Sequence, residues 1–364
     1  MSEHREKLWY ILNYIAEIGP VTTQKLIEYT GDIEELMELS TDELRESNIL
    51  NDKMLRAWND KRPMDDALIR QYEENEAMGM HFASIESENY PERLKNIPGH
   101  PYGIHYIGRN ANDYARTASI IGSRGCTGYG RELATEIGKR LSRIGVCVIS
   151  GMALGIDAAG QWGALNAGGA SVGVLGGGVD VCYPRENMPL YERLMSDGSI
   201  ISEQPCGCPA LPTNFRLRNR IISGLSDCVI VVEARKKSGT QITVSYALDQ
   251  GRDIFCVPGR LTDPLSAGCN EMISQGARIL HDFSELAQYF ESDDLNVNVA
   301  RNIELSPAEM LVYEKLTDDL QHIEDLLMAT GLPVADLMSV LLNLEIKGVV
   351  HQQIKNYFRR CVRL

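Results

Sequence analysis

In the first 75 residues, apolar and polar positions alternate with the period of a helix, in short stretches. Residues three or four positions apart share one face of a helix, and this spacing joins Leu8, Ile11, Leu12, Ile15 and Ile18. Gly19-Pro20 ends the run, and Ser40-Thr41 begins a later helix with a capping pattern. The pattern predicts a small helical domain over residues 1–75.

Short apolar runs then alternate with amphipathic stretches. The predicted strands are 118–121, 146–149, 171–175, 199–201, 228–232 and 254–257, and the predicted helices between them are 128–144, 155–167, 187–197, 214–224 and 240–251. Continuous apolar strands are typical of a parallel sheet covered on both faces. Residues 76–290 are therefore predicted to be an α/β domain with an extended Rossmann-like, mainly parallel sheet, whose ligands gather beyond the carboxyl ends of the strands.

The last segment predicts a third domain. The polar stretch 291–302 is a linker by composition, and residues 303–364 contain three helix patterns followed by two short strand patterns, at Val349-Val350 and Tyr357-Phe358. This order is typical of a winged helix. Its third helix, 333–346, carries Asp336 and Glu345, which is poorly suited to reading a DNA groove. Protein docking is the favoured role of this domain.

Charge and composition narrow the classes of function. The 364 residues have 36 basic and 50 acidic side chains, a net charge of -14, but residues 76–290 hold 20 basic and 21 acidic ones, and 16 of the 20 are arginines that suit phosphate. No apolar run spans a membrane and the start is not a signal peptide, so the protein is expected to be cytoplasmic. Nine scattered cysteines, with no CxxC, favour reduced thiols and no metal site.

Several glycine-containing loops follow the predicted strands. Gly122-Ser123-Arg124 precedes a helix, but its spacing is not GxGxxG and the next strand ends in Ser150-Gly151 without an acid, so an NAD enzyme and any other cofactor are not expected. The backbone N–H groups at the start of that helix are nevertheless expected to bind an anion, and Lys237-Ser238-Gly239 also opens a helix in a way that suits an anion. A Walker A motif does not occur, and a nucleophile elbow of the GxSxG type is not expected. Asp157 is interpreted as a helix-start acid rather than a catalytic one.

The densest basic cluster is 214–222. On a helix, Phe215 and Arg218 lie near one face with Asn219 close by, so the ring can stack on a base while the arginine binds its phosphate. The alternative is that Phe215 and Ile222 are core residues and the arginines are solvated. The segment alone leaves both interpretations open.

These motifs together resemble the DNA-processing protein A family (DprA/Smf). The matching strings include Gly122-Ser123-Arg124, Gly151-Met152-Ala153, Tyr183-Pro184, Arg218-Asn219-Arg220 and Ser238-Gly239-Thr240. The resemblance implies a non-enzymatic protein that binds single-stranded DNA, forms a homodimer through the Rossmann-like domain and helps to load RecA in transformation or recombination. Carried over by position, it implies a DNA-binding set without catalytic residues, made of Ser123, Arg124, Gly151, Phe215, Arg218, Asn219, Arg220, Lys237, Ser238 and Gly239.

The sequence departs from the family at Gln161, where histidine is common, and at Arg216-Leu217, where Arg216 can restore the charge lost at Leu217. Two rival functions remain. Phosphoribohydrolases of the lysine-decarboxylase-like type have a related glycine loop, and Glu233 is the candidate acid for such a reaction. The third hypothesis is an adaptor whose acidic ends recruit partners.

Overall fold

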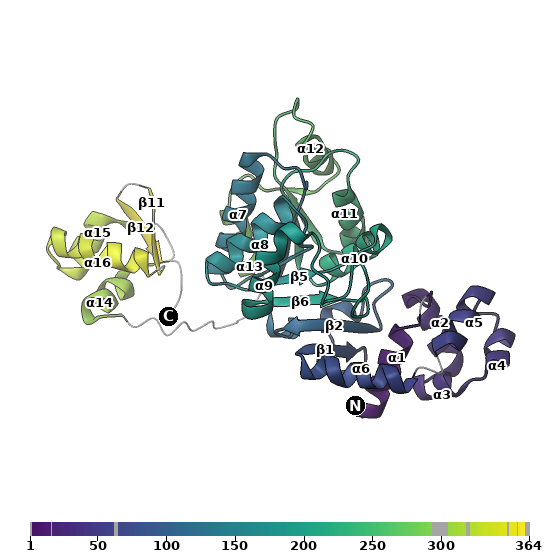
Figure 1. The fold of residues 1–364 in the computed structure, drawn as a ribbon. Coiled ribbons are helices and arrows are strands. Elements are labelled where there is room, and N and C mark those ends of the chain that lie inside the picture. Colours follow the sequence, from purple (N-terminus) through teal and green to yellow (C-terminus); the bar gives the residue numbers. More distant parts are fainter. Residues whose placement is uncertain are drawn as a thin grey trace. The chain divides into compact units, whose positions relative to one another are not determined.

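The computed structural model describes residues 2–15, 17–61, 65–292, 305–317, 321–347, 349–354 and 356–360. They belong to two units, Met1–Leu295 and Asn296–Leu364 (Figure 1). Within the described residues, the first unit contains a nine-stranded sheet of order β1-β2-β6-β5-β4-β3-β7-β8-β9. Its strands are β1 (Met80–Ser84), β2 (Gly103–Gly108), β3 (Thr117–Ile121), β4 (Cys147–Ser150), β5 (Ser171–Val174), β6 (Ser199–Ser202), β7 (Cys228–Val231), β8 (Asp253–Cys256) and β9 (Arg278–Ile279).

Helices cover both faces of this sheet. Side chains alternate across a strand, so Ile120 packs in one buried cluster and Ile121 in another. The Ile120 side is covered by α7 (Gly128–Arg143), α8 (Ile156–Asn166) and α13 (Ser284–Ser292). The Ile121 side is covered by α10 (Pro212–Gly224), α11 (Gly239–Asp249) and α12 (Ala267–Ser274). The predicted α/β fold with a mainly parallel sheet is confirmed.

Two antiparallel strands extend the sheet beyond the sequence prediction. β1 pairs with β2, placing Phe82 opposite His105, and β2 pairs antiparallel with β6, placing Tyr106 opposite Ile201. All pairs from β6 through β9 are parallel. The connection from β5 to β6 runs through α9 (Met188–Asp197). The edge strands were not predicted because His81, His105 and Tyr106 interrupt their apolar pattern.

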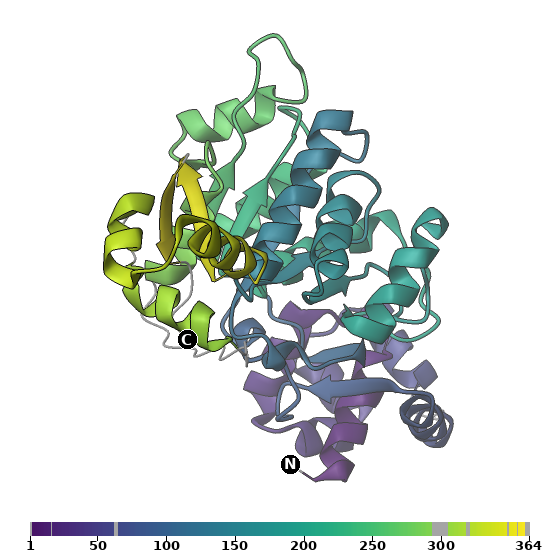
Figure 2. The same ribbon diagram turned by 90° about the vertical axis from the view of Figure 1, so that its left-hand side faces the viewer.

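The N-terminal helices pack against these two strands (Figure 2). They are α1 (Glu3–Asn13), α2 (Pro20–Thr30), α3 (Ile33–Glu38), α4 (Thr41–Glu46), α5 (Asp52–Lys61) and α6 (Asp65–Ala77). Their core includes Trp9, Leu36 and Trp58, which are almost fully buried. The Glu6 carboxylate on α1 accepts hydrogen bonds from the Ser84 N–H and hydroxyl at 2.8 and 2.6 Å. These bonds tie the helices to the sheet.

The second unit has its own core and the elements of a winged helix. Its helices are α14 (Pro307–Lys315), α15 (Ile323–Thr330) and α16 (Val334–Ile346), and its strands β10 (Gln321–His322), β11 (Val350–Ile354) and β12 (Tyr357–Arg360) pair in the order β10-β12-β11. Val312, Leu326, Leu341 and Phe358 form the centre of the core. The predicted winged-helix fold is confirmed. Most of the predicted linker, 293–302, lies outside the described residues.

Candidate functional site

A large candidate site lies beside β3 and β7, where the order of the parallel strands reverses. From β3 the strand order runs through β4, β5 and β6 on one side, and β7 and β8 follow on the other. The loops after β3 and β7 therefore leave the same sheet edge in opposite directions, which opens a crevice. A hollow of about 1180 Å³ lies there, and its lining includes 121–125, parts of α10, Arg235 and most of 237–246.

The structure brings eight of the ten predicted site residues to this hollow. Its lining includes Ser123, Arg124, Phe215, Arg218, Asn219, Lys237, Ser238 and Gly239, whereas Gly151 and Arg220 are not part of it. These residues come from three separate loops and helices. The fold therefore brings together most of the residues that the family resemblance implies for the site.

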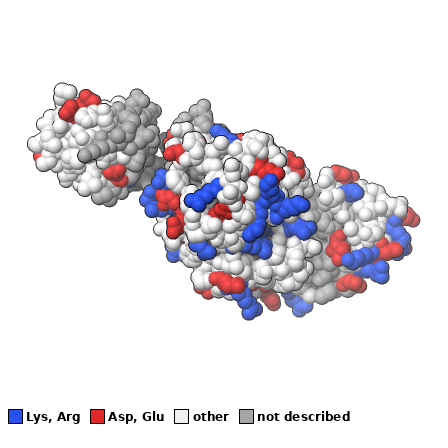
Figure 3. All heavy atoms as spheres, turned by 90° about the horizontal axis from the view of Figure 1, so that it is seen from above, with Lys and Arg blue, Asp and Glu red and all other residues white. Residues whose placement is uncertain are grey.

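Positive charge dominates the exposed part of the lining. Arg124, Arg216, Arg235 and Lys237 are exposed and line the hollow, and among the described residues none of them forms an ion pair with a carboxylate. The Arg124 guanidinium lies 5.8 Å from the centre of the Phe215 ring. Lys and Arg side chains also gather near the middle of the first unit on the face shown in Figure 3. The hollow is thus positive in a chain whose net charge is -14.

The N-terminus of α11 faces this charge. Ser238 is the residue that precedes the helix, and no side chain caps that end. Its hydroxyl oxygen is buried and has no hydrogen-bond partner in the described structure. The first N–H groups of a helix and its dipole attract anions, and a buried hydroxyl normally has a partner. This end of the hollow is therefore suited to a phosphate oxygen.

The N-terminus of α7, by contrast, is occupied by a carboxylate of the protein. Glu233 accepts hydrogen bonds from the Thr127 N–H at 2.9 Å and from its hydroxyl at 2.6 Å. A Cβ on Gly130 would lie 2.4 Å from the Glu233 carboxyl carbon. The expectation that the Gly122–Gly128 loop presents the start of this helix to an anion is therefore wrong. Glu233 is also the candidate acid of the phosphoribohydrolase hypothesis, and both of its carboxylate oxygens accept hydrogen bonds from Thr127.

Arg218 also lines the hollow, but its guanidinium forms hydrogen bonds with the protein's own backbone. It is buried, and its guanidinium donates to the carbonyl of Gly151 at 2.9 Å and to that of Val174. Burial lowers the pKa of Arg218 to about 10, while the nearby Asp157 carboxylate opposes this shift. Burial also raises the pKa of Asp157, which accepts the Gly151 N–H at 3.2 Å. Arg218 thus holds the end of β5 and the loop after β4 in place.

Arg220 points to a different part of the first unit. It donates to the Gly99 carbonyl at 2.7 Å and pairs with Glu203 at 2.6 Å, and both side chains are largely buried. Three residues further back, Leu217 is exposed and does not line the hollow, whereas Arg216 does. Arg216 therefore supplies a positive charge at the hollow, as expected from the departure at Leu217. Arg220 instead ties α10 to Gly99 and Glu203.

Tyr183 lines the hollow but is not in the DNA-binding set that the family resemblance implies. Its ring is 46% exposed, and its centre lies 5.3 Å from that of Phe215, with the two planes tilted by 33°. Gly176 allows this arrangement, because a Cβ there would lie 2.7 Å from the Phe215 ring. The available signal was a Tyr-Pro pair soon after three consecutive glycines. Two aromatic rings therefore lie side by side at the hollow.

Gln161 is remote from these groups. It is fully buried on α8, and its amide donates to the Ser171 hydroxyl and the Val172 carbonyl, both at 3.2 Å. The substitution of the family's common histidine is therefore a feature of the helix-sheet packing. Among the described residues, no group of three or more His, Cys, Asp and Glu side chains is placed to hold a metal ion.

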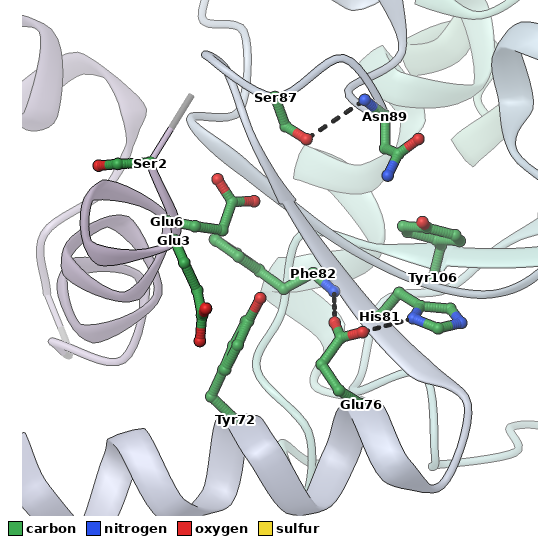
Figure 4. Close-up of a pocket in the computed structure, with 10 residues that line it drawn as sticks. All are labelled: Ser2, Glu3, Glu6, Tyr72, Glu76, His81, Phe82, Ser87, Asn89 and Tyr106. Carbon is green, nitrogen blue, oxygen red and sulfur yellow. Dashed lines mark hydrogen bonds and ion pairs between the residues drawn. The ribbon is translucent and has the colours of Figure 1, made fainter.

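A smaller hollow of about 290 Å³ lies between α1, α6 and the edge strands (Figure 4). Its lining includes the carboxylates Glu3, Glu6 and Glu76, and Glu76 bonds to His81 at 2.6 Å. Burial raises the pKa of Glu6, although its bonds with Ser84 oppose the shift. This acidic lining repels phosphate, so we do not associate the smaller hollow with nucleic acid.

Fold and site together define a class of Rossmann-like proteins that have a positive, aromatic-containing crevice and an appended winged helix. The comparisons identify the family. Residues 81–291 match the family DNA recombination-mediator protein A, and residues 300–353 match the DprA winged helix domain. The chain belongs to the DNA recombination-mediator protein A family, DprA/Smf, and has its role in DNA processing and recombination.

Relatives agree over most of the chain. Protein Smf of Synechocystis sp. is 27% identical, and the match covers 97% of this chain and 98% of the relative. The X-ray structure of DprA from Streptococcus pneumoniae has a TM-score of 0.67 and 29% identity, covering 78% of this chain and 95% of that one. DNA processing protein A from Helicobacter pylori, whose structure is described for its single-stranded DNA binding mode, has a TM-score of 0.54 and 26% identity, covering 58% and 96%.

Proposed function

We propose that the large hollow binds single-stranded DNA and that the protein acts without catalysing a reaction. The observation that carries this proposal is the set of four exposed cations, Arg124, Arg216, Arg235 and Lys237, beside the uncapped start of α11. Cations and helix N-termini bind phosphate without reading sequence. The single-stranded DNA binding of the Helicobacter pylori relative supports the same ligand.

The aromatic rings favour an unpaired strand over a duplex. Bases stack on exposed rings only when they are not enclosed in a double helix, and each such contact contributes about 1 to 3 kcal/mol. The hollow, at about 1180 Å³, exceeds the roughly 300 to 1,000 Å³ of a small-molecule pocket. Several linked nucleotides therefore fit the size and the chemistry better than one nucleoside.

A titration of fluorescent oligothymidine tests the proposal. We expect the affinity to fall between about 50 and about 200 mM salt, because bound cations release counterions from the strand. In an Arg124→Ala, Lys237→Ala variant, affinity should drop and the slope against log salt should decrease by about 1.4, since each single-strand phosphate contact contributes about 0.7.

A matched variant separates this effect from a change in net charge. Arg131→Ala, Lys236→Ala removes the same charge from exposed positions outside the lining, so it should bind almost as tightly as the parent chain. The proposal fails if the two double variants behave alike, or if blunt duplex DNA binds as tightly as oligothymidine.

The finer part of the proposal concerns partners. We infer that the chain forms a homodimer through its Rossmann-like unit and helps to load RecA onto the bound strand, protecting incoming or exposed single strands. The two-residue edge strand β9, with Ile279 44% exposed, supports pairing at this unit. Sedimentation of the full chain tests the dimer, and RecA filament formation on oligothymidine tests loading. An unchanged filament rate would remove the loading role.

A further inference from the structure

The second unit leaves an apolar stripe in solvent on α16. Val334, Met338 and Leu342 are 59%, 43% and 58% exposed. Residues four apart lie on the same side of a helix, so the three form one continuous stripe. The core of this unit is built from the neighbouring positions Leu337, Leu341 and Leu344. The stripe is therefore not needed for the unit's own packing.

The preceding helix, α15, also exposes an apolar side chain to solvent. Met328 on α15 is 80% exposed. None of the described helices has, by itself, the length and hydropathy of a membrane span, and Ile323–Thr330 with Val334–Glu345 meets that test only as a pair, across a bend of 109°. An exposed apolar surface of this kind commonly marks a contact with another molecule.

The charges on these two helices have one sign. In the described residues α15 and α16 contain Glu324, Asp325, Asp336 and Glu345, and neither helix contains Lys or Arg. Just beyond α16, Lys347 pairs with Glu309 at 2.7 Å. A helix that reads DNA needs side chains that bind bases and phosphates. These carboxylates would instead repel phosphate, so nucleic acid does not match this surface.

We propose that the α16 stripe docks an amphipathic helix of a partner protein, with its apolar face on Val334, Met338 and Leu342 and a Lys or Arg side chain beside Glu345, which lies three residues beyond Leu342 on the same helix face. Helix-in-groove recognition uses this spacing of apolar anchors. A second copy of this chain is a poorer occupant, because two such surfaces would place like charges together. The partner helix is therefore expected to be basic.

A designed peptide tests the surface on the full chain. The probe is a fluorescein-labelled helical peptide with leucine at positions i, i+3, i+4 and i+7 and lysine elsewhere, and its partner probe has glutamate in place of lysine. We expect the lysine peptide to bind at least about tenfold more tightly than the glutamate peptide, as measured by fluorescence anisotropy. Equal affinity for the two peptides would overturn the proposal.

Matched variants locate the binding. Met338→Ser, Leu342→Ser should weaken the lysine peptide at least about tenfold, whereas Val21→Ser, Tyr29→Ser, at similarly exposed positions of the first unit (61% and 55%), should not. A second variant, Glu345→Gln, keeps an oxygen for the Gln352 N–H and removes the charge, so about two- to fivefold weaker binding is expected. This variant tests the surface even if the double variant unfolds.

Three further outcomes would overturn the inference. The first is equal binding by the two double variants. The second is self-association of the parent chain that disappears in Met338→Ser, Leu342→Ser, which would make a second copy the occupant. The third is weaker binding of duplex DNA by that variant, which would make the stripe part of a DNA-binding surface.

Discussion

Substitution of Arg218 tests what holds the hollow together, because this side chain both donates hydrogen bonds to the backbone and lies near a buried carboxylate. Its guanidinium donates to two backbone carbonyls and lies near the buried Asp157 carboxylate. In Arg218→Met the apolar stem is kept, but both carbonyls lose a donor and the carboxylate loses its cation. Breaking a buried pair in this way costs about 3 to 5 kcal/mol. We expect urea unfolding, followed by circular dichroism, to show a loss of that size.

The loss should grow with pH. Burial already raises the pKa of Asp157, and removal of Arg218 raises it further, since the cation lowers it. A carboxyl whose folded pKa lies above its unfolded value contributes stability at low pH and loses it as pH rises through the folded pKa. The variant should therefore be closer to the parent chain near about pH 5 than near about pH 8.

A second substitution supplies the control. Asp157→Asn in the Arg218→Met background removes the unpaired charge, so the double variant should regain stability near about pH 8 and lose the pH dependence. Arg124→Met, at an exposed position, should change unfolding by less than about 0.5 kcal/mol. The reasoning is refuted if Arg218→Met unfolds within about 1 kcal/mol of the parent chain and only its DNA binding changes.

Three further outcomes are expected. Tyr183→Ala should weaken oligothymidine about five- to hundredfold while Tyr183→Phe does not, because the ring supplies the stacking surface. Gly176→Ala should also weaken it, because the new Cβ would lie 2.7 Å from Phe215; an unchanged titration curve would contradict this. Burial lowers the pKa of His105 to about 3, so stability should fall as pH drops from about 6.5 towards 3. His105→Gln should remove about 2 kcal/mol of that fall at about pH 5, measured by urea midpoints.

The parallel part of the fold was predictable because it depends on local patterns. Continuous apolar runs such as 228–232 correspond to strands buried on both faces, here Cys228–Val231, and the glycines that follow them mark the sheet edge. Strands β1 and β2 carry polar side chains that are satisfied by distant groups: the Ser84 hydroxyl by Glu6, and the His105 ring by Asn13 at 2.9 Å. No local pattern contains such partners.

The same limit explains which site residues the sequence placed correctly in space and which it did not. Lys237, Ser238 and Gly239 needed only a strand followed by a helix start, and their position at the hollow follows from that order. The Gly122–Gly128 loop has the same local signature, yet its helix start is closed by Glu233, more than a hundred residues away in sequence. Two helix N-termini of similar sequence thus differ in whether a distant carboxylate reaches them. The test of an anion site is therefore the hydrogen-bond partner at the helix start, which only the folded chain reveals.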